Sequence, residues 1–241
     1  MNTNKWDDIG YSFLIDGDGV VFQGRGWGVV GAHTKGYNSQ GYGIAILGNF
    51  ATASPSAEAL ESAKRLIAAG VMANACGVTI VSRSEWGARS PVEETLMFDP
   101  KPYAIIHHTA TSTCSGNHCK AVMRAIQNFH MDTRGWSDIG YNFLVGADGI
   151  VYEGRGWSVL GRHAKGWNNV SYGFSVIGNF MTNRPTQAAL KAVRAMIEQA
   201  VQSGYLTRTY KVLGHRDVGN TSCPGDEFYE VIKTWPHYGR P

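Results

Sequence analysis

The sequence predicts an α/β fold in which helices cover a mixed central β-sheet. Three features of residues 79–241 indicate it: short apolar runs typical of buried strands, stretches with the helical spacing of apolar residues, and a turn that joins antiparallel strands. Alternating strands and helices favour parallel pairing, whereas the hairpin adds an antiparallel pair. A mixed sheet with helical layers follows from the two together.

The first half of this region supplies a strand, a helix and a hairpin. Residues 103–107 form an apolar run after Pro102, which suits a buried strand. Residues 120–132 carry apolar side chains at helical spacing. Residues 141–145 and 150–153 flank a Gly-Ala-Asp-Gly turn, and this pattern predicts a hairpin.

The second half predicts two further strands and two helices. Residues 174–177 form another buried strand, and residues 185–203 an amphipathic helix with Gly204 just beyond its end. We expect a brief strand at 212–213, directly before His215, and a last helix at 226–235.

Composition excludes several classes of protein. The chain of 241 residues has a formal net charge of +3. It lacks a run of Lys and Arg residues of the kind that binds nucleic acid. It has no apolar run of about 18 residues that could cross a bilayer. The N-terminal residues also lack the apolar segment of a signal peptide.

An internal repeat divides the chain. A shift of 130 positions aligns Trp6 with Trp136 and runs without a gap to Phe50 and Phe180, with 25 of 45 pairs identical. We therefore expect a truncated repeat at 1–78, which has no counterpart of residues 103–134 or 214–225, and a complete domain at 79–241. A chain shortened at its start would also account for the missing signal peptide.

Cysteine and histidine positions point to chemistry. Cys114 and Cys119 lie five apart in a Ser/Gly/Asn stretch and can form a local disulfide. Cys223 follows His215 by eight positions, and such a thiol is a metal ligand, a nucleophile or an inert buried side chain. The pair His107-His108 favours the first, because two imidazoles and a thiolate form a zinc site with one position open for water.

Six motifs give residues 80–241 a close resemblance to a complete peptidoglycan recognition protein domain. This is the fold shared with phage lysozyme-type zinc amidases, the type 2 amidases. The motifs are Ser84-Glu85-Trp86-Gly87-Ala88-Arg89, Ile105-Ile106-His107-His108-Thr109-Ala110, Asp138-Ile139-Gly140-Tyr141-Asn142-Phe143, Tyr152-Glu153-Gly154-Arg155-Gly156-Trp157, Leu213-Gly214-His215-Arg216-Asp217 and Trp235-Pro236-His237.

The resemblance implies an activity and its residues. His107, His215 and Cys223 would bind Zn²⁺, while Tyr141 and Thr221 would assist catalysis. The implied reaction is hydrolysis of the bond between N-acetylmuramic acid and L-alanine in bacterial peptidoglycan. The Cys114–Cys119 pair matches the family's disulfide. A secreted antibacterial protein of innate immunity is the implied setting.

Substrate contacts are implied in the same way. The groove that holds the muramic acid and the stem peptide would use His130, Arg134, Tyr141, His163 and Asn168. The pair Gly135-Trp136 is the one associated with diaminopimelic acid, rather than lysine, at the third position of the stem.

Two classes of function remain open. The first is the zinc amidase, and the second is a receptor that binds peptidoglycan without cutting it. Binding-only members of the family typically lack the cysteine or the first histidine, and this chain has both, which favours the enzyme. A purely structural zinc site is disfavoured because such sites fill all four positions with Cys or His. The first copy, which retains Tyr11, His33 and Asn38, lacks all three ligands.

Overall fold

The computed structural model describes residues 8–26, 30–38, 41–75, 78, 80–97 and 100–239, without the side chains of residues 68–75. The chain forms two compact units, Met1–Asn74 and Ala75–Pro241. Among the described residues, no helix is both long and apolar enough to cross a membrane.

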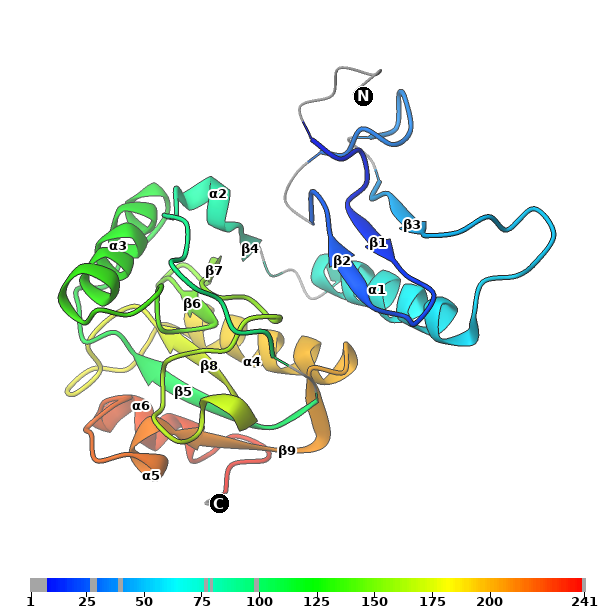
Figure 1. Ribbon diagram of the computed structural model, residues 1–241. Helices are drawn as coiled ribbons and strands as arrows, with labels where there is room; N and C mark the ends of the chain where they lie inside the picture. Colours follow the sequence, from blue (N-terminus) through cyan, green and yellow to red (C-terminus); the bar gives the residue numbers. More distant parts are fainter. Residues whose placement is uncertain are drawn as a thin grey trace. The chain divides into compact units, whose positions relative to one another are not determined.

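The second unit is built on a six-stranded sheet (Figure 1). Only the pair β6 and β7 is antiparallel among its five pairings, so the sheet is mixed, and the predicted fold class is confirmed. In spatial order its strands are β4 (Ile80–Val81), β7 (Val151–Glu153), β6 (Phe143–Val145), β8 (Ser171–Val176), β5 (Lys101–His108) and β9 (Leu206–Gly214).

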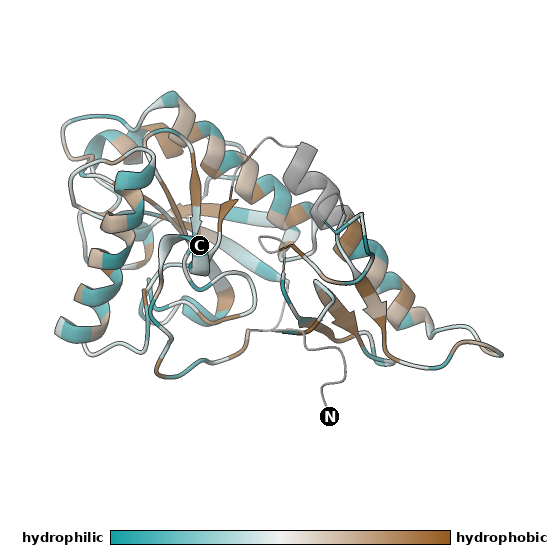
Figure 2. Cartoon of the chain, turned by 90° about the horizontal axis from the view of Figure 1, so that it is seen from above, coloured by the Kyte–Doolittle hydropathy of each residue, from teal (hydrophilic) through white to brown (hydrophobic). Residues whose placement is uncertain are grey.

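One face of this sheet packs against α4 (Gln187–Gln202) and α6 (Asp226–Ile232). Phe143 and Val145 of β6 point to this face and lie in one buried cluster with Val193 and Phe228 of the helices. The hydroxyl of Thr186 accepts a hydrogen bond from the N–H of Ala189 and so caps the start of α4. Figure 2 shows brown, hydrophobic strands beside helices that carry both brown and teal.

The other face packs against α2 (Arg83–Trp86) and α3 (Asn117–Asn128). Leu144, between the two β6 residues above, points to this face and joins the cluster of Trp86 and Met123. The predicted disulfide is confirmed: Cys114 and Cys119 are bonded with an S–S distance of 2.09 Å. It ties the loop before α3 to the first turn of that helix.

Several boundaries differ from those expected. The last strand covers Leu206–Gly214 rather than 212–213, because its exposed first half is polar and shows no apolar alternation. The helix expected at 120–132 begins at Asn117 and continues beyond Asn128 as a π-helical turn, η1 (Phe129–Thr133). The short elements β4, α2, α5 (His215–Val218) and the 3₁₀ turn η2 (Asn168–Val170) were not expected, because so few residues carry no periodicity.

The first unit has a three-stranded sheet and one helix. Its strands are β1 (Phe13–Ile15), β2 (Val21–Gln23) and β3 (Ile44–Ile46), and its helix is α1 (Ala57–Ala75). The order β2-β1-β3 and its pairings match those of β7-β6-β8 at the 130-residue shift. A small cluster of Phe13, Ile15, Ala59 and Leu66 forms its core.

Candidate metal centre

The parallel pair β5 and β9 brings two histidines to one edge of the sheet. His107 is the next-to-last residue of β5, and His215 follows directly after β9 as the first residue of α5. Because adjacent parallel strands end at the same edge, residues 108 positions apart become neighbours. Their ring centroids lie 4.5 Å apart.

Cys223 completes the group from the loop between α5 and α6. One ligand atom from each of His107, His215 and Cys223 lies within 4.8 Å of the other two. Cys223 Sγ lies 3.7 Å from His107 Nδ1. A tetrahedral zinc ion, with Zn–S near 2.3 Å and Zn–N near 2.0–2.1 Å, holds such atoms about 3.5 Å apart. The pair His107 and Cys223 is close to that spacing, and two imidazoles with one thiolate are donor types that zinc takes.

The protonation of the group also suits a metal. Burial, and then the proximity of His163, His215 and His108, holds the pKa of His107 well below its usual value, and burial lowers that of His215. Both shifts favour the neutral ring, the form that binds metals. Burial raises the pKa of Cys223 to about 12, and a coordinated divalent cation is what deprotonates such a thiol.

Tyr141 and Thr221 both lie between His107 and Cys223 in the chain. The Tyr141 ring lies 5.2 Å from that of His107, and burial, followed by the nearby Cys223, raises the pKa of its hydroxyl. Tyr141 thus keeps its proton and can donate a hydrogen bond. Thr221 Oγ1 accepts a hydrogen bond from the N–H of Cys223 at 3.1 Å, which shapes the ligand loop.

The comparisons with known proteins identify the family of this chain. A family model described as N-acetylmuramoyl-L-alanine amidase matches residues 1–89 and 98–226. Human peptidoglycan recognition protein 3 is 41% identical over 264 residues, which cover 98% of this chain and 77% of that protein. The chain belongs to the peptidoglycan recognition protein family.

Two further members of this family match about two thirds of this chain. Peptidoglycan-recognition protein SC2 of Drosophila melanogaster is 48% identical over 163 residues, covering 67% of this chain and 89% of that protein. The crystal structure of peptidoglycan recognition protein-LE, in complex with tracheal cytotoxin, has a TM-score of 0.66 at 41% identity. That match covers 67% of this chain and 96% of the other.

His130 and Trp136, both expected to contact substrate, form a wall next to Tyr141. The two rings stack with centroids 4.7 Å apart, and the His130 ring lies 5.7 Å from that of Tyr141. His130 Nδ1 accepts a hydrogen bond from the N–H of Gly140, and burial lowers its pKa to about 4. The Arg162 guanidinium covers the Trp136 ring at 5.6 Å. Gly140 thus contacts the His130 ring of this wall, and Arg162 contacts its Trp136 ring.

Arg134 and Gly135, also expected in the groove, connect η1 to this wall. Both are exposed, and the Arg134 guanidinium lies 5.3 Å from the centroid of the Phe129 ring. Gly135 has φ +64°, a left-handed conformation that favours glycine. The backbone turn at Gly135 separates the arginine from the Trp136 ring.

His163 and Asn168, the remaining expected contacts, lie behind His107. His163 is only 6% exposed, and its Nδ1 lies 2.9 Å from His107 Nε2. Asn168 Oδ1 accepts hydrogen bonds from the N–H groups of His163 and Ala164. Sequence reasoning missed this contact with the candidate ligand His107, although the repeat gave a signal, since His33 and Asn38 occupy the same positions in the first copy.

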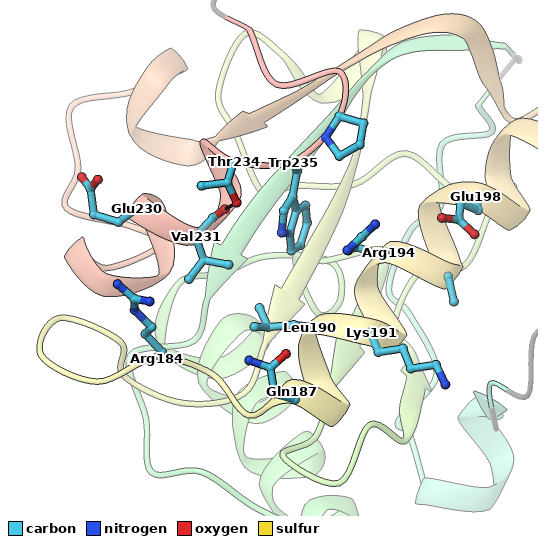
Figure 3. A pocket seen from close by; sticks show the side chains of 12 residues that line it. Arg184, Gln187, Leu190, Lys191, Arg194, Glu198, Glu230, Val231, Thr234 and Trp235 are labelled. Carbon is cyan, nitrogen blue, oxygen red and sulfur yellow. Dashed lines mark hydrogen bonds between the residues drawn. The ribbon is translucent and has the colours of Figure 1, made fainter.

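A cavity of the second unit lies elsewhere, between α4 and α6 (Figure 3). It has a volume of about 950 Å³ and a mixed lining of basic, acidic and apolar side chains. These include Arg184, Leu190, Lys191, Arg194, Glu198, Glu230, Val231 and Trp235, and none of the expected site residues is among those that line it. The metal centre is therefore distinct from this cavity.

Proposed function

We propose that the chain is a zinc-dependent N-acetylmuramoyl-L-alanine amidase. It binds bacterial peptidoglycan and hydrolyses the amide bond between N-acetylmuramic acid and L-alanine. The observation that carries the proposal is the convergence of His107, His215 and Cys223 on a common point beside Tyr141. Three protein ligands leave a fourth position open, as catalytic zinc sites do.

The protein's own residues take defined parts in this reaction. When bound, Zn²⁺ supplies Lewis acidity, which acidifies a water molecule and polarises the scissile carbonyl. Tyr141, whose raised pKa keeps its hydroxyl protonated, donates a hydrogen bond to the oxygen on which negative charge develops. Thr221 holds the Cys223 backbone through its hydroxyl and so fixes the ligand loop.

We propose peptidoglycan of the diaminopimelic type as the preferred substrate. The tracheal cytotoxin bound to peptidoglycan recognition protein-LE is a monomeric diaminopimelic acid-type peptidoglycan. In this chain the exposed Arg134 precedes Gly135 and the stacked Trp136, so a cation and an aromatic surface adjoin the site. We also propose secretion and a role in innate immunity, which the Cys114–Cys119 disulfide supports because disulfides persist in oxidising compartments.

The test uses the full chain of 241 residues. Purified protein is assayed for bound zinc and for release of stem peptides from purified peptidoglycan, before and after chelation and again after zinc is restored. Loss on chelation and recovery with zinc is the expected result. Peptidoglycan binding without release, by a protein that contains zinc, would instead identify a non-catalytic receptor.

A further inference from the structure

The side chain of His163 makes a close polar contact with the side chain of His107. His163 Nδ1 and His107 Nε2 lie 2.9 Å apart, and the two rings meet edge to face with centroids 5.0 Å apart. The other nitrogen of His107, Nδ1, is the one that faces Cys223 Sγ. One nitrogen of the ligand ring thus faces the metal position and the other faces His163.

This arrangement allows only one pattern of protons when a metal is bound. His107 Nδ1 must offer its lone pair, so the proton of the neutral ring sits on Nε2. His107 Nε2–H then donates, and His163 Nδ1 accepts. The opposite pattern, in which His163 Nδ1–H donates, leaves the proton of His107 on Nδ1 and blocks the ligand atom.

The backbone around His163 holds its ring in place for this contact. A Cβ atom at Gly173 would lie 2.4 Å from the His163 ring and one at Gly161 would lie 2.6 Å from it, so the ring fits against both only because they are glycines. Asn168 Oδ1 fixes the backbone from the other side by accepting the N–H groups of His163 and Ala164, each at 2.9 Å. The ring has little freedom to turn away from His107.

The first unit provides an internal comparison. His33 lies in the same kind of cradle, since a Cβ atom at Gly31 or Gly43 would lie 2.3 Å from its ring. In that copy His33 Nδ1 contacts Thr34 Oγ1 at 3.1 Å. The second copy has Ala164 at the position of Thr34, so its His163 has no such local partner and its Nδ1 is available to His107.

We propose that His163 is a positioning residue of the metal centre. Its Nδ1 accepts the Nε2–H of His107, and this bond fixes the orientation and the proton position of the ligand ring. The inference rests on the proposed metal role of His107. Partners that orient a ligating histidine typically change metal affinity or activity by about 10–100-fold when they are removed.

The test measures zinc affinity rather than activity. The full chain and its variants are titrated with zinc in competition with a chromogenic chelator. His163→Ala, which removes the acceptor, and His163→Gln, whose amide reaches the Nε2 position instead, should bind zinc about 10–100-fold more weakly. His163→Asn places an amide oxygen at the Nδ1 position and should stay close to the parent affinity. If the Ala, Gln and Asn variants all bound zinc with the same affinity, the inference would be overturned.

A second pair of variants leaves His163 itself intact. Ala164→Thr introduces the hydroxyl that Thr34 presents to His33, and Ala164→Val adds the same volume without a hydroxyl. Because Ala164 is only 2% exposed, both variants add a similar volume at a buried position, and threonine also buries a hydroxyl. Thermal unfolding checks that both variants still fold. The threonine variant should bind zinc more weakly than the valine variant. Equal zinc affinity in this pair would contradict competition for His163 Nδ1.

The outcomes separate this inference from the proposed function. Parent protein that binds zinc but releases no stem peptides would contradict the amidase and leave the positioning role standing. Parent protein that takes up no zinc would overturn both. Zinc uptake and hydrolysis that are unaffected by His163→Ala would overturn the positioning role alone.

Discussion

At the scale of single residues, a change at Cys223 should separate the hydrolysis of peptidoglycan from its binding. We expect Cys223→Ser to abolish hydrolysis, because a neutral hydroxyl is a poor zinc ligand and a thiolate a strong one. Binding should persist, since the wall of His130 and Trp136 does not depend on the thiol. Pull-down on insoluble peptidoglycan and stem release are measured together, with Ser222→Ala as the neighbouring control. Stem release near the parent rate by metal-free Cys223→Ser protein would contradict the zinc mechanism.

Tyr141 offers a test that keeps the metal ligands. Tyr141→Phe removes the hydroxyl but leaves the ring that lies 5.2 Å from His107. We expect zinc content to be unchanged and kcat to fall by about 10²–10³-fold, the usual cost of one lost donor to a developing oxyanion. A fall in kcat accompanied by a proportional loss of zinc would instead assign Tyr141 a structural role.

His130 makes stability depend on pH. Its folded pKa of about 4 lies below the unfolded value near 6.5, so the unfolded chain binds more protons between these values. This contribution is complete above pH about 6.5 and is lost as the pH falls towards about 4. His130→Asn removes the titration and retains an acceptor for the N–H of Gly140.

The comparison is made by urea unfolding at several pH values between about 7 and 4.5. As the pH falls over this window, the free energy of unfolding should decrease less steeply for the variant than for the parent protein. The two slopes should differ by up to about 1.4 kcal/mol per pH unit. Parallel curves for the two proteins would show that His130 does not carry the effect.

At the scale of elements, the turn after η1 should set the stem preference. The second carboxylate of diaminopimelic acid can form a charge-assisted hydrogen bond with Arg134, worth about 1.5–3 kcal/mol if well aligned. We therefore expect a tenfold or larger preference over lysine-type stems of matched length. Arg134→Ala should reduce it, whereas Arg208→Ala, on the exposed half of β9, should not. Equal binding of both stem types by the parent protein would reject this specificity.

Sequence patterns predicted the elements that have strong periodicity. The buried strand at β5, the hairpin of β6 and β7, and the amphipathic α4 were all foreseen, since their apolar residues recur at strand or helix spacing. The polar half of β9 and the π-helical turn η1 were not, because pairing to a neighbouring strand and a local change of hydrogen bonding leave no such signal. Residue types indicated a candidate ligand set, but the contact between His107 and His163 depends on packing between distant segments.

At the scale of the whole molecule, the two units should differ in stability. The buried cluster of the first unit contains only Phe13, Ile15, Ala59 and Leu66 among the described residues, whereas Phe22, Leu47 and Ile67 are 47%, 48% and 53% exposed. Amides of β1 and β3 should therefore exchange with deuterium faster than those of β5 and β8 in the intact chain. A fragment of residues 1–78 should show no cooperative thermal transition as a monomer. A cooperative transition would contradict this.

The strands at the borders of the two sheets affect how copies of the chain associate with one another at high concentration. β9 is partly covered, because the N–H of Val212 donates to the carbonyl of His237, and its polar half carries Arg208 and Lys211, charges that discourage addition of another strand. The sheet of the first unit is bordered by β2, whose three residues are all exposed, and by β3, after which Leu47 is exposed. Self-association should therefore begin at these two strands, and lysines placed at Phe22 and Leu47 should delay it, as followed by light scattering.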